Sequence, residues 1–261
     1  MKTAPTALVT GASSGIGLEM ARVLADKAYS LILVARTEKA LQELATELRQ
    51  RGAPVVEVLA MDLAKVGAAK KISEQIQSRG LTVTHLINNA GFGDHGAFAE
   101  SSWLKQADML QVNIVALTEL THLFLPGMRQ RKQGWILNVA STASFQPGPL
   151  MSVYYATKAF VLSFSEGLAE ELRNDGVFVT ALCPGPTHSK FMAVAGVGKM
   201  ALLSVFSMPT SEKVARYGIQ AMEAGQVVAV QGFFNWVSAS TVGLLPRFLV
   251  RKMVRKLQES R

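Results

Sequence analysis

Cysteine is almost absent from this sequence, and its absence excludes two kinds of structural support. Cys183 is the only cysteine of 261 residues, so the chain can form neither a disulfide framework nor a multi-cysteine zinc site. It stands in the apolar stretch VTALCPGP, where a small buried side chain is expected. The sequence also holds four histidines: His85, His95, His122 and His188. They show no metal-ligand spacing, so no metal site is expected.

A secretory signal and a broadly basic body are also lacking. The strand-like TALVTG begins within the first few residues, which predicts a cytoplasmic protein. The formal charge is +8, but residues 244–261 hold six basic residues and one glutamate, or +5 of that total. The basic character therefore belongs mainly to the end of the chain, and no nucleic-acid partner is expected.

Long uncharged runs are scarce, and the one near the end of the sequence does not predict a membrane span. Residues 226–246 contain no charged side chain, which is enough length to cross a bilayer. Polar side chains and Pro246 interrupt this run, and its first half has the pattern of a strand. We therefore expect a last strand there, followed by an irregular or helical segment.

Seven apolar runs rich in β-branched residues are present, and each predicts a strand. They begin near residues 6, 30, 54, 83, 135, 177 and 226. Amphipathic segments such as 37–51 and 64–79 lie between them, with leucines and isoleucines at helical spacing. Because the strands are apolar on both faces and alternate with helices, they predict a doubly wound α/β domain with a parallel sheet.

The first predicted strand runs into the glycine-rich turn TGASSGIG, and a helical segment follows at once. Gly11, Gly15 and Gly17 would let the backbone turn tightly and approach a pyrophosphate. The free N–H groups at the start of the helix would then bind its charge. A glycine-rich turn between the first strand and the first helix indicates a dinucleotide site.

The second predicted strand ends in LVART, which bears on the choice of dinucleotide. Sites that bind a free ribose usually place an acidic residue here, but this chain has Ala35 and then Arg36. An arginine can make a charge-assisted contact with a 2′-phosphate. Arg36 therefore predicts a preference for NADP(H) over NAD(H), although a solvated arginine at a strand end is the simpler alternative.

Two adjacent tyrosines stand in the stretch SVYYATKAF at residues 152–160. Tyr154 and Lys158 are four residues apart and share one face of a helix, whereas Tyr155 points elsewhere. A nearby ammonium is expected to lower the pKa of Tyr154 and to make it a proton donor and acceptor. Tyr155 is expected to be a packing or pocket residue.

These motifs together resemble the short-chain dehydrogenase/reductase family. TGASSGIG at 10–17, NNAG at 88–91, YYATK at 154–158 and PGPT at 184–187 follow the order and spacing of that family over residues 6–232. The resemblance implies a Rossmann-type fold, a nicotinamide cofactor and a catalytic set of Asn113, Ser141, Tyr154 and Lys158. Ser141 lies 13 residues before Tyr154, the interval usual in the family.

The resemblance also implies a set of cofactor-binding residues. Asp62 would contact the adenine, although it could instead cap a helix that follows it. Ser14 stands where many NADPH-preferring members have a basic residue, which leaves Arg36 to discriminate between the cofactors. The full expected set is Gly11, Ser13, Ser14, Gly15, Ile16, Gly17, Arg36, Asp62, Leu63, Asn89, Ala90, Gly91, Tyr154, Lys158, Pro184, Gly185 and Thr187.

Two segments leave the alternating rhythm and bear on the substrate and on partners. Residues 187–209, apolar and punctuated by glycines, occupy the place of a substrate lid, although ordinary core or subunit-interface packing is an equal alternative. Beyond a catalytic region at 1–232, residues 233–261 form an extension. If helical from Pro246, its end would stack Leu249, Met253 and Leu257 on one face, typical of a helix on an anionic membrane surface. A helix packed on the body is the alternative.

The sequence thus predicts an NADP-dependent oxidoreductase that interconverts a lipophilic carbonyl compound and an alcohol, with Tyr154 as acid and base. A 3-oxoacyl-thioester reductase is an alternative, and a non-catalytic NADPH-binding regulatory protein is an alternative of another class. Family resemblance further suggests a homodimer or homotetramer, and peripheral membrane contact through residues 244–261 is a further expectation.

Overall fold

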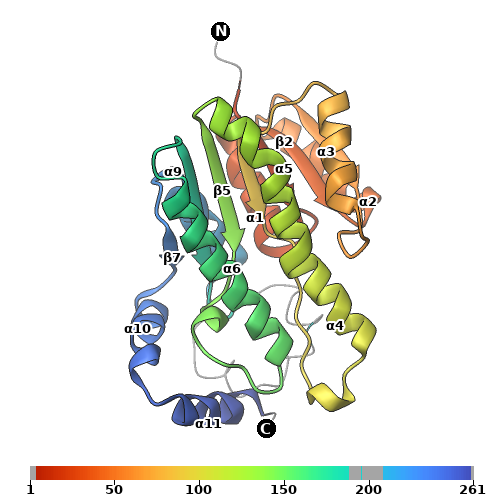
Figure 1. Ribbon diagram of the computed structural model, residues 1–261. Coiled ribbons are helices and arrows are strands. Elements are labelled where there is room, and N and C mark those ends of the chain that lie inside the picture. Colours follow the sequence, from red (N-terminus) through yellow and green to blue (C-terminus); the bar gives the residue numbers. More distant parts are fainter. Residues whose placement is uncertain (1–3, 188–194, 196–207, 260–261) are drawn as a thin grey trace.

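All seven predicted strands form, and they make one parallel sheet in the computed structural model (Figure 1), which describes residues 4–187, 195 and 208–259. The strands are β1 Thr6–Thr10, β2 Ser30–Ala35, β3 Val56–Ala60, β4 His85–Asn88, β5 Gly134–Val139, β6 Val177–Cys183 and β7 Val228–Val230. Their order across the sheet is β3-β2-β1-β4-β5-β6-β7. The predicted doubly wound, Rossmann-type architecture is confirmed.

Helices cover both faces of this sheet. The α-helices are α1 Gly15–Asp26, α2 Glu38–Gln50, α3 Ala68–Ser78, α4 Trp103–Leu110, α5 Leu117–Gln130, α6 Ser152–Glu171, α9 Ser211–Glu223, α10 Phe233–Thr241 and α11 Arg247–Gln258. Shorter helical turns are η1 Phe98–Glu100, the π-helical η2 Gln111–Ala116, η3 Thr142–Phe145 and η4 Val242–Leu244. Helices α1, α2 and α9 pack on one face, and α3, α5 and α6 pack on the other. The expected helix at 37–51 is therefore α2, and the one at 64–79 begins later, at Ala68.

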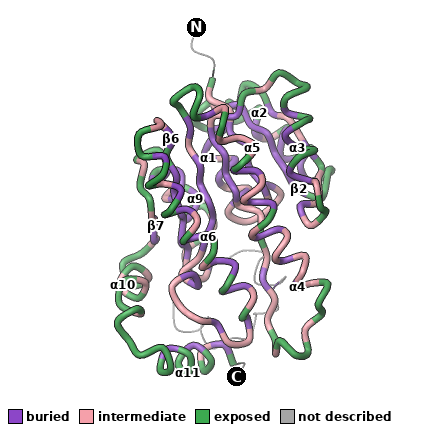
Figure 2. The backbone as a smooth tube through the Cα atoms, in the orientation of Figure 1, coloured by how far each residue is buried: buried purple, intermediate pink, exposed green. Residues whose placement is uncertain are grey.

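The two apolar cores lie between the sheet and these helix layers. The β2 run SLILVA is buried along its whole length, as a strand covered on both faces must be. Figure 2 shows the buried backbone concentrated in the sheet and the inner sides of the helices. The apolar runs of the sequence are thus accounted for by burial between layers.

The strand order places a functional crevice at one edge of the sheet. The strand order reverses at β1, because β2 and β3 are added on one side of it and β4 to β7 on the other, all of them parallel. Ligands of open parallel sheets bind outside the carboxyl ends of the strands at such a reversal. Figure 1 shows α10 and α11 at this same end of the molecule, opposite the N-terminus.

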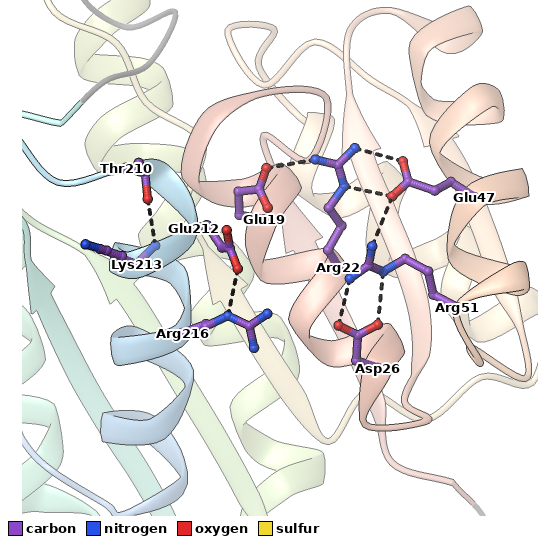
Figure 3. A network of polar contacts seen from close by, with 9 residues as sticks. All are labelled: Glu19, Arg22, Asp26, Glu47, Arg51, Thr210, Glu212, Lys213 and Arg216. Atoms are coloured by element: carbon purple, nitrogen blue, oxygen red, sulfur yellow. Dashed lines mark hydrogen bonds and ion pairs between the residues drawn. The ribbon is translucent and has the colours of Figure 1, made fainter.

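A charged network fixes α1 against α2 on the outer surface (Figure 3). Arg22 Nη1 lies 2.8 Å from a carboxylate oxygen of Glu19, and Arg22 Nε lies 2.8 Å from one of Glu47. Arg51 Nη2 lies 2.7 Å from a carboxylate oxygen of Asp26. Side chains from two helices share these contacts, so the network orients the helix that follows the glycine-rich turn.

The uncharged run at 226–246 does not form a spanning helix. Its first part is β7, and α10 has only 9 residues. One continuous helical stretch, Trp103–Gln130, has the length and mean hydropathy of a membrane span. Within its most apolar 18 residues, 33% are buried inside the molecule. It packs through Val112, Leu120 and Met128 in the core beside the sheet. Most of the predicted lid at 187–209 lies outside the described residues.

Candidate active site

A cavity of about 890 Å³ opens at the carboxyl ends of the strands. Its walls include the glycine-rich turn after β1, the end of β2, the loops after β3, β4 and β5, the start of α6 and the loop after β6. Of the predicted catalytic and cofactor-binding residues, only Gly17 and Asn113 are not part of its lining. One site therefore gathers residues from 11 to 187 of the sequence.

Tyr154 and Ser141 form the centre of the site. Ser141 is the residue before η3, and its Oγ accepts a hydrogen bond from the backbone N–H of Ala143 at 3.1 Å. The side chains of Ser141 and Tyr154 are hydrogen-bonded to each other. Both residues line the cavity and lie within hydrogen-bond distance of each other, so a carbonyl oxygen bound there could accept from both hydroxyls.

Lys158 lies one turn further along α6, on the same side as Tyr154. Its Nζ donates to the backbone carbonyl of Val139 at 2.7 Å and lies 5.9 Å from the centre of the Tyr154 ring. Burial lowers the pKa of this lysine from 10.5 to about 8. The pKa of Lys158 therefore lies only slightly above neutral pH. Its ammonium is close enough to Tyr154 to affect the tyrosine electrostatically.

The predicted lowering of the pKa of Tyr154 is wrong for this structure. Burial is the largest influence and raises the pKa of Tyr154 well above its ordinary value of 10. The hydrogen bond with Ser141 acts in the opposite direction but is the smaller effect. The hydroxyl therefore keeps its proton at neutral pH, which suits a proton donor in carbonyl reduction more than a base in alcohol oxidation.

Asn113 supports the site from outside the cavity lining. It lies in the π-helical turn η2, and its Oδ1 accepts from Phe92 N–H at 3.1 Å. Its Nδ2 donates to the Phe92 carbonyl at 3.0 Å and to Thr157 Oγ1 at 3.1 Å. The side chain thus ties the loop after β4 to the helix that carries Tyr154 and Lys158.

The side chain of Asn89 packs against the glycine-rich turn and binds its backbone. Its Nδ2 donates to the Thr10 carbonyl at 2.9 Å. A Cβ built on Gly17 would lie 2.3 Å from this nitrogen, and one on Gly11, whose φ is +67°, would lie 2.8 Å from it. Glycine is therefore required at both positions, and the Asn89 side chain supports the turn while its backbone lines the cavity.

The start of α1 fits a pyrophosphate. Ser14 makes no side-chain capping hydrogen bond, and the first turn of α1 contains no acidic residue. The first N–H groups of a helix lack partners within the helix and carry a partial positive charge. Gly91 also lines the cavity, and a Cβ at this position would lie only 3.0 Å from Asn113 Oδ1.

Arg36, after β2, and Asp62, after β3, also line the cavity. Arg36 is exposed, and within the described residues no carboxylate forms a salt bridge with it, so its guanidinium is available to an anionic group. Asp62 does not cap the next helix, because α3 begins six residues later, at Ala68, with Gly67 before it. Asp62 Oδ1 instead accepts from Ala64 N–H at 3.1 Å in a local turn.

Part of the cavity wall was not foreseen from the sequence. It comes from residues 234–258, within the extension that the sequence predicts beyond the catalytic region. The lining residues from this part are Phe234, Asn235, Ser238, Ala239, Thr241, Val242, Leu245, Val250, Met253, Val254, Leu257 and Gln258. A signal was present in the spacing of Val250, Val254 and Gln258, which are four residues apart and share one face of α11.

The face of α11 that packs on the body is not the one that carries Leu249 and Met253. Val250, Val254 and Gln258 are buried, whereas Leu249 and Met253 are largely exposed. The two valines pack in one cluster with Tyr154 and Tyr155. The helix itself forms as expected, from Arg247 to Gln258. Its inner face closes the cavity because the valines fit against the tyrosine pair, and Leu249 is left outside.

Tyr155 holds the end of this helix. Its hydroxyl accepts a hydrogen bond from Gln258 Nε2 at 2.5 Å. The backbone carbonyl of Gln258 lies 2.9 Å from His95 Nε2 in the loop after β4. Gly148 approaches the ring of Tyr155 so closely that a Cβ there would lie 2.1 Å from it. Tyr155 is thus a packing and pocket residue, as expected.

Known proteins similar to this chain share both the sequence pattern and the fold. The family model described as short chain dehydrogenase matches residues 5–197. A protein of Pyrenophora tritici-repentis described as very-long-chain 3-oxoacyl-CoA reductase is 35% identical over 252 residues, which cover 93% of this chain and 71% of that protein.

Two solved structures add to this likeness. A short-chain dehydrogenase from Sphingobium yanoikuyae in complex with NADPH is 30% identical, with a TM-score of 0.81 and coverage of 92% of this chain and 94% of that one. The bulky-bulky ketone specific alcohol dehydrogenase from Comamonas testosteroni is 28% identical, with a TM-score of 0.78 and coverage of 92% and 93%. The chain belongs to the short-chain dehydrogenase family and is an oxidoreductase that uses a nicotinamide dinucleotide.

Proposed function

We propose that this protein is an NADPH-preferring reductase of lipophilic carbonyl compounds, with 3-oxoacyl thioesters as its main substrate class. The observation that carries the proposal is the meeting of the hydrogen-bonded Tyr154–Ser141 pair and the buried Lys158 in one cavity with a largely apolar outer wall. The pair provides proton donation to a carbonyl oxygen, and the wall provides space for an acyl chain.

The residues divide the work of the reaction. A bound reduced nicotinamide supplies a hydride to the carbonyl carbon. Ser141 donates a hydrogen bond to the carbonyl oxygen and holds it beside Tyr154. Tyr154 gives its proton to that oxygen as charge develops there, and the product is an alcohol. The positive charge of Lys158 stabilises the phenolate that the tyrosine leaves behind.

The preference for NADPH rests on Arg36. Its guanidinium is exposed at the end of β2, lines the cavity and is not held by a salt bridge within the described residues. A 2′-phosphate placed there would gain charge-assisted hydrogen bonds that a free hydroxyl cannot make. The similar protein from Sphingobium yanoikuyae, solved with NADPH, supports this assignment.

The substrate class rests on the relatives and on the wall of the cavity. The Pyrenophora tritici-repentis protein is described as a very-long-chain 3-oxoacyl-CoA reductase. Met151, Val250 and Val254 give this chain an apolar wall beside Tyr154. Bulky ketones are a second candidate class, favoured by the likeness to the Comamonas testosteroni enzyme.

The proposal also includes contact with a membrane surface and assembly into a homo-oligomer. A lipophilic substrate partitions into bilayers, so contact of the end of the chain with a membrane surface belongs to the same proposal. A homodimer or homotetramer follows from the family resemblance, and multi-angle light scattering would test it. Exposed Val115 on η2 and Phe160 on α6 are candidate contact residues away from the cavity.

The test is NADPH oxidation against 3-oxoacyl-CoA thioesters of increasing acyl length and against bulky ketones. Tyr154→Phe should lower kcat by about 10²- to 10⁴-fold with little change in NADPH affinity, whereas Tyr155→Phe should have a mild effect. The opposite pattern would show that the site is assigned one residue out of register. A Tyr154→Phe protein that keeps every cellular effect would favour a regulatory NADPH-binding protein instead.

A further inference from the structure

Large apolar side chains are exposed together at the end of the chain. They lie on α10, η4 and α11 and are between 42% and 82% exposed: Phe233, Phe234, Trp236, Leu244, Leu245, Phe248, Leu249 and Met253. We call this set the C-terminal apolar surface. Single exposed apolar residues are ordinary, but so many within 21 positions mark a contact surface.

The C-terminal apolar surface is held in place by the other side of α11. Val250 and Val254 are buried against the tyrosine pair, and Gln258 binds Tyr155 and His95. Because the inner face of α11 is fixed in this way, the helix cannot rotate to bury Leu249. Figure 2 shows α10 and α11 as a largely exposed ledge along one end of the molecule.

Positive charge surrounds this surface. Arg247, Arg251, Lys252, Arg255 and Lys256 are all exposed on α11. Glu259 is the only acidic side chain described after Glu223, and it pairs with Arg255 at 3.0 Å. Apolar and aromatic residues beside a cluster of cations are the composition that binds an anionic bilayer surface.

The same elements form both the surface and the cavity wall. Phe234, Leu245 and Met253 line the cavity and are also exposed, so they lie at its rim. A second segment with exposed apolar residues, 98–104, lies at the same end of the molecule in Figure 1. Phe98, Trp103 and Leu104 are all more than half exposed.

We propose that the C-terminal apolar surface docks on an anionic lipid bilayer, with the rim of the cavity at the membrane, so that lipophilic substrate passes from lipid into the site. The docking stands on the exposed residues and charges alone. The passage of substrate rests on the proposed function.

A second copy of the chain is a less favourable occupant of this surface. A two-fold contact places the same patch of one subunit against the same patch of its partner. Here it would bring two clusters of five exposed cations together, with one paired glutamate on each side. An anionic bilayer instead complements that charge, and it also accommodates Trp236 and the phenylalanines at its interface.

The test is co-sedimentation of the full chain with phosphatidylcholine vesicles that contain about 30% phosphatidylserine, at low and high salt. The wild type should sediment with these vesicles, and high salt or pure phosphatidylcholine should weaken binding at least tenfold. Leu244→Ser/Phe248→Ser should weaken it to a similar extent. Neither residue lines the cavity. Val55→Ser/Val227→Ser, which also removes two exposed apolar side chains, should not change binding.

The contribution of the exposed cations of α11 to bilayer binding is tested with a separate variant. Arg251→Gln/Lys252→Gln should weaken binding to anionic vesicles by about fivefold for each cation removed and leave binding to neutral vesicles unchanged. A wild-type chain that stays in the supernatant would overturn docking. So would a Leu244→Ser/Phe248→Ser variant that sediments normally, or one that converts a dimer to a monomer by light scattering, since the surface would then be a self-contact.

The reductase assay without vesicles separates this proposal from the proposed function. Leu244→Ser/Phe248→Ser should keep wild-type kcat and KM for a water-soluble ketone, and lose activity at least fivefold only on substrate embedded in vesicles. Loss of activity toward the soluble ketone as well would mean that these residues act on the site itself and would overturn the docking role. Absence of activity in the wild type would overturn the proposed function and leave the docking result standing.

Discussion

Gln258, three residues before the last residue of the sequence, donates a hydrogen bond of 2.5 Å to the hydroxyl of Tyr155, which lies 103 residues earlier and next to Tyr154. The bond joins α11 to α6 within a buried cluster. Gln258 Oε1 is buried as well and lacks a hydrogen-bond partner within the described residues. The attachment of α11 to the active site therefore depends on the polar contacts of Gln258 with Tyr155 and His95 and on two valines.

We predict that Gln258→Leu loosens α11 without disabling the chemistry. Loss of this bond leaves the Tyr155 hydroxyl buried and unpaired, which costs about 1–3 kcal/mol. Amide exchange in α11 should become faster while exchange in α2 is unchanged, and KM for a long-chain substrate should rise more than kcat falls.

A double-mutant cycle checks this contact directly. Tyr155→Phe/Gln258→Leu removes both partners, so it should be less destabilised than the sum of the single variants. Arg255→Gln, on the exposed side of the same helix, is the matched control. Additive effects within about 0.3 kcal/mol would contradict the contact as described.

Arg36→Ala should shift the cofactor preference. The loss of charge-assisted hydrogen bonds to a 2′-phosphate should raise KM for NADPH about 10- to 100-fold and leave KM for NADH nearly unchanged. Lys39→Ala, an exposed neighbouring cation outside the cavity lining, should change neither value. Equal changes for the two cofactors would show that Arg36 does not discriminate between them.

The pH dependence of reduction should follow Lys158. Its pKa is lowered by burial to about 8, so the ammonium carries its charge below that pH and loses it above. The pKa of Tyr154 is raised above 10, so the tyrosine keeps its proton throughout this range. We expect kcat/KM to fall as pH rises through about 8, with circular dichroism confirming an intact fold at each pH. A flat profile up to pH 9.5 would contradict the assignment.

His85 should make the fold sensitive to acid. Its ring is buried, stacks on Trp135 with centroids 4.5 Å apart, and has its pKa lowered by burial from 6.5 to about 4. The unfolded chain binds a proton below pH 6.5 and the folded chain does not until about pH 4. Stability is therefore present above pH 6.5 and is lost as pH falls through that window.

The expected loss between pH 7 and pH 4.5 is about 2 kcal/mol in the free energy of unfolding. Urea denaturation at the two pH values would measure it. His85→Phe keeps an aromatic ring against Trp135 and removes the titration, so the pH dependence should shrink by that amount. An unchanged pH dependence in this variant would assign acid sensitivity to other groups.

The fold and the core of the candidate site were predictable from the sequence because their signals are local. The seven strands are apolar runs, and each formed within a few residues of its predicted place. The assignment of Tyr154 over Tyr155 rests on short intervals to Lys158 and Ser141. In the structure Ser141 is hydrogen-bonded to Tyr154, and Tyr155 instead binds Gln258. The catalytic roles themselves remain predictions.

Features that depend on contacts between distant segments could not be predicted in this way. Local spacing predicts that Lys158 lowers the pKa of Tyr154, but burial under η3 and α11 dominates and raises it. Asp62 precedes a helical pattern closely enough to suggest a cap, but the helix starts only at Ala68. Desolvation and helix starts are set by what packs on a residue, which short intervals do not record.

The sequence by itself thus determined the parallel sheet, the glycine-rich turn and the register of the tyrosine and lysine, since periodicity and spacing encode them. Only the tertiary structure decided that α11 closes the cavity with Val250 and Val254 and turns Leu249 outward. The stripe of Leu249 and Met253 and the neighbouring stripe of Val250 and Val254 are both apolar, so composition left the choice between them open. The fit of the valines against Tyr154 and Tyr155, 95 to 100 residues away in sequence, settled it.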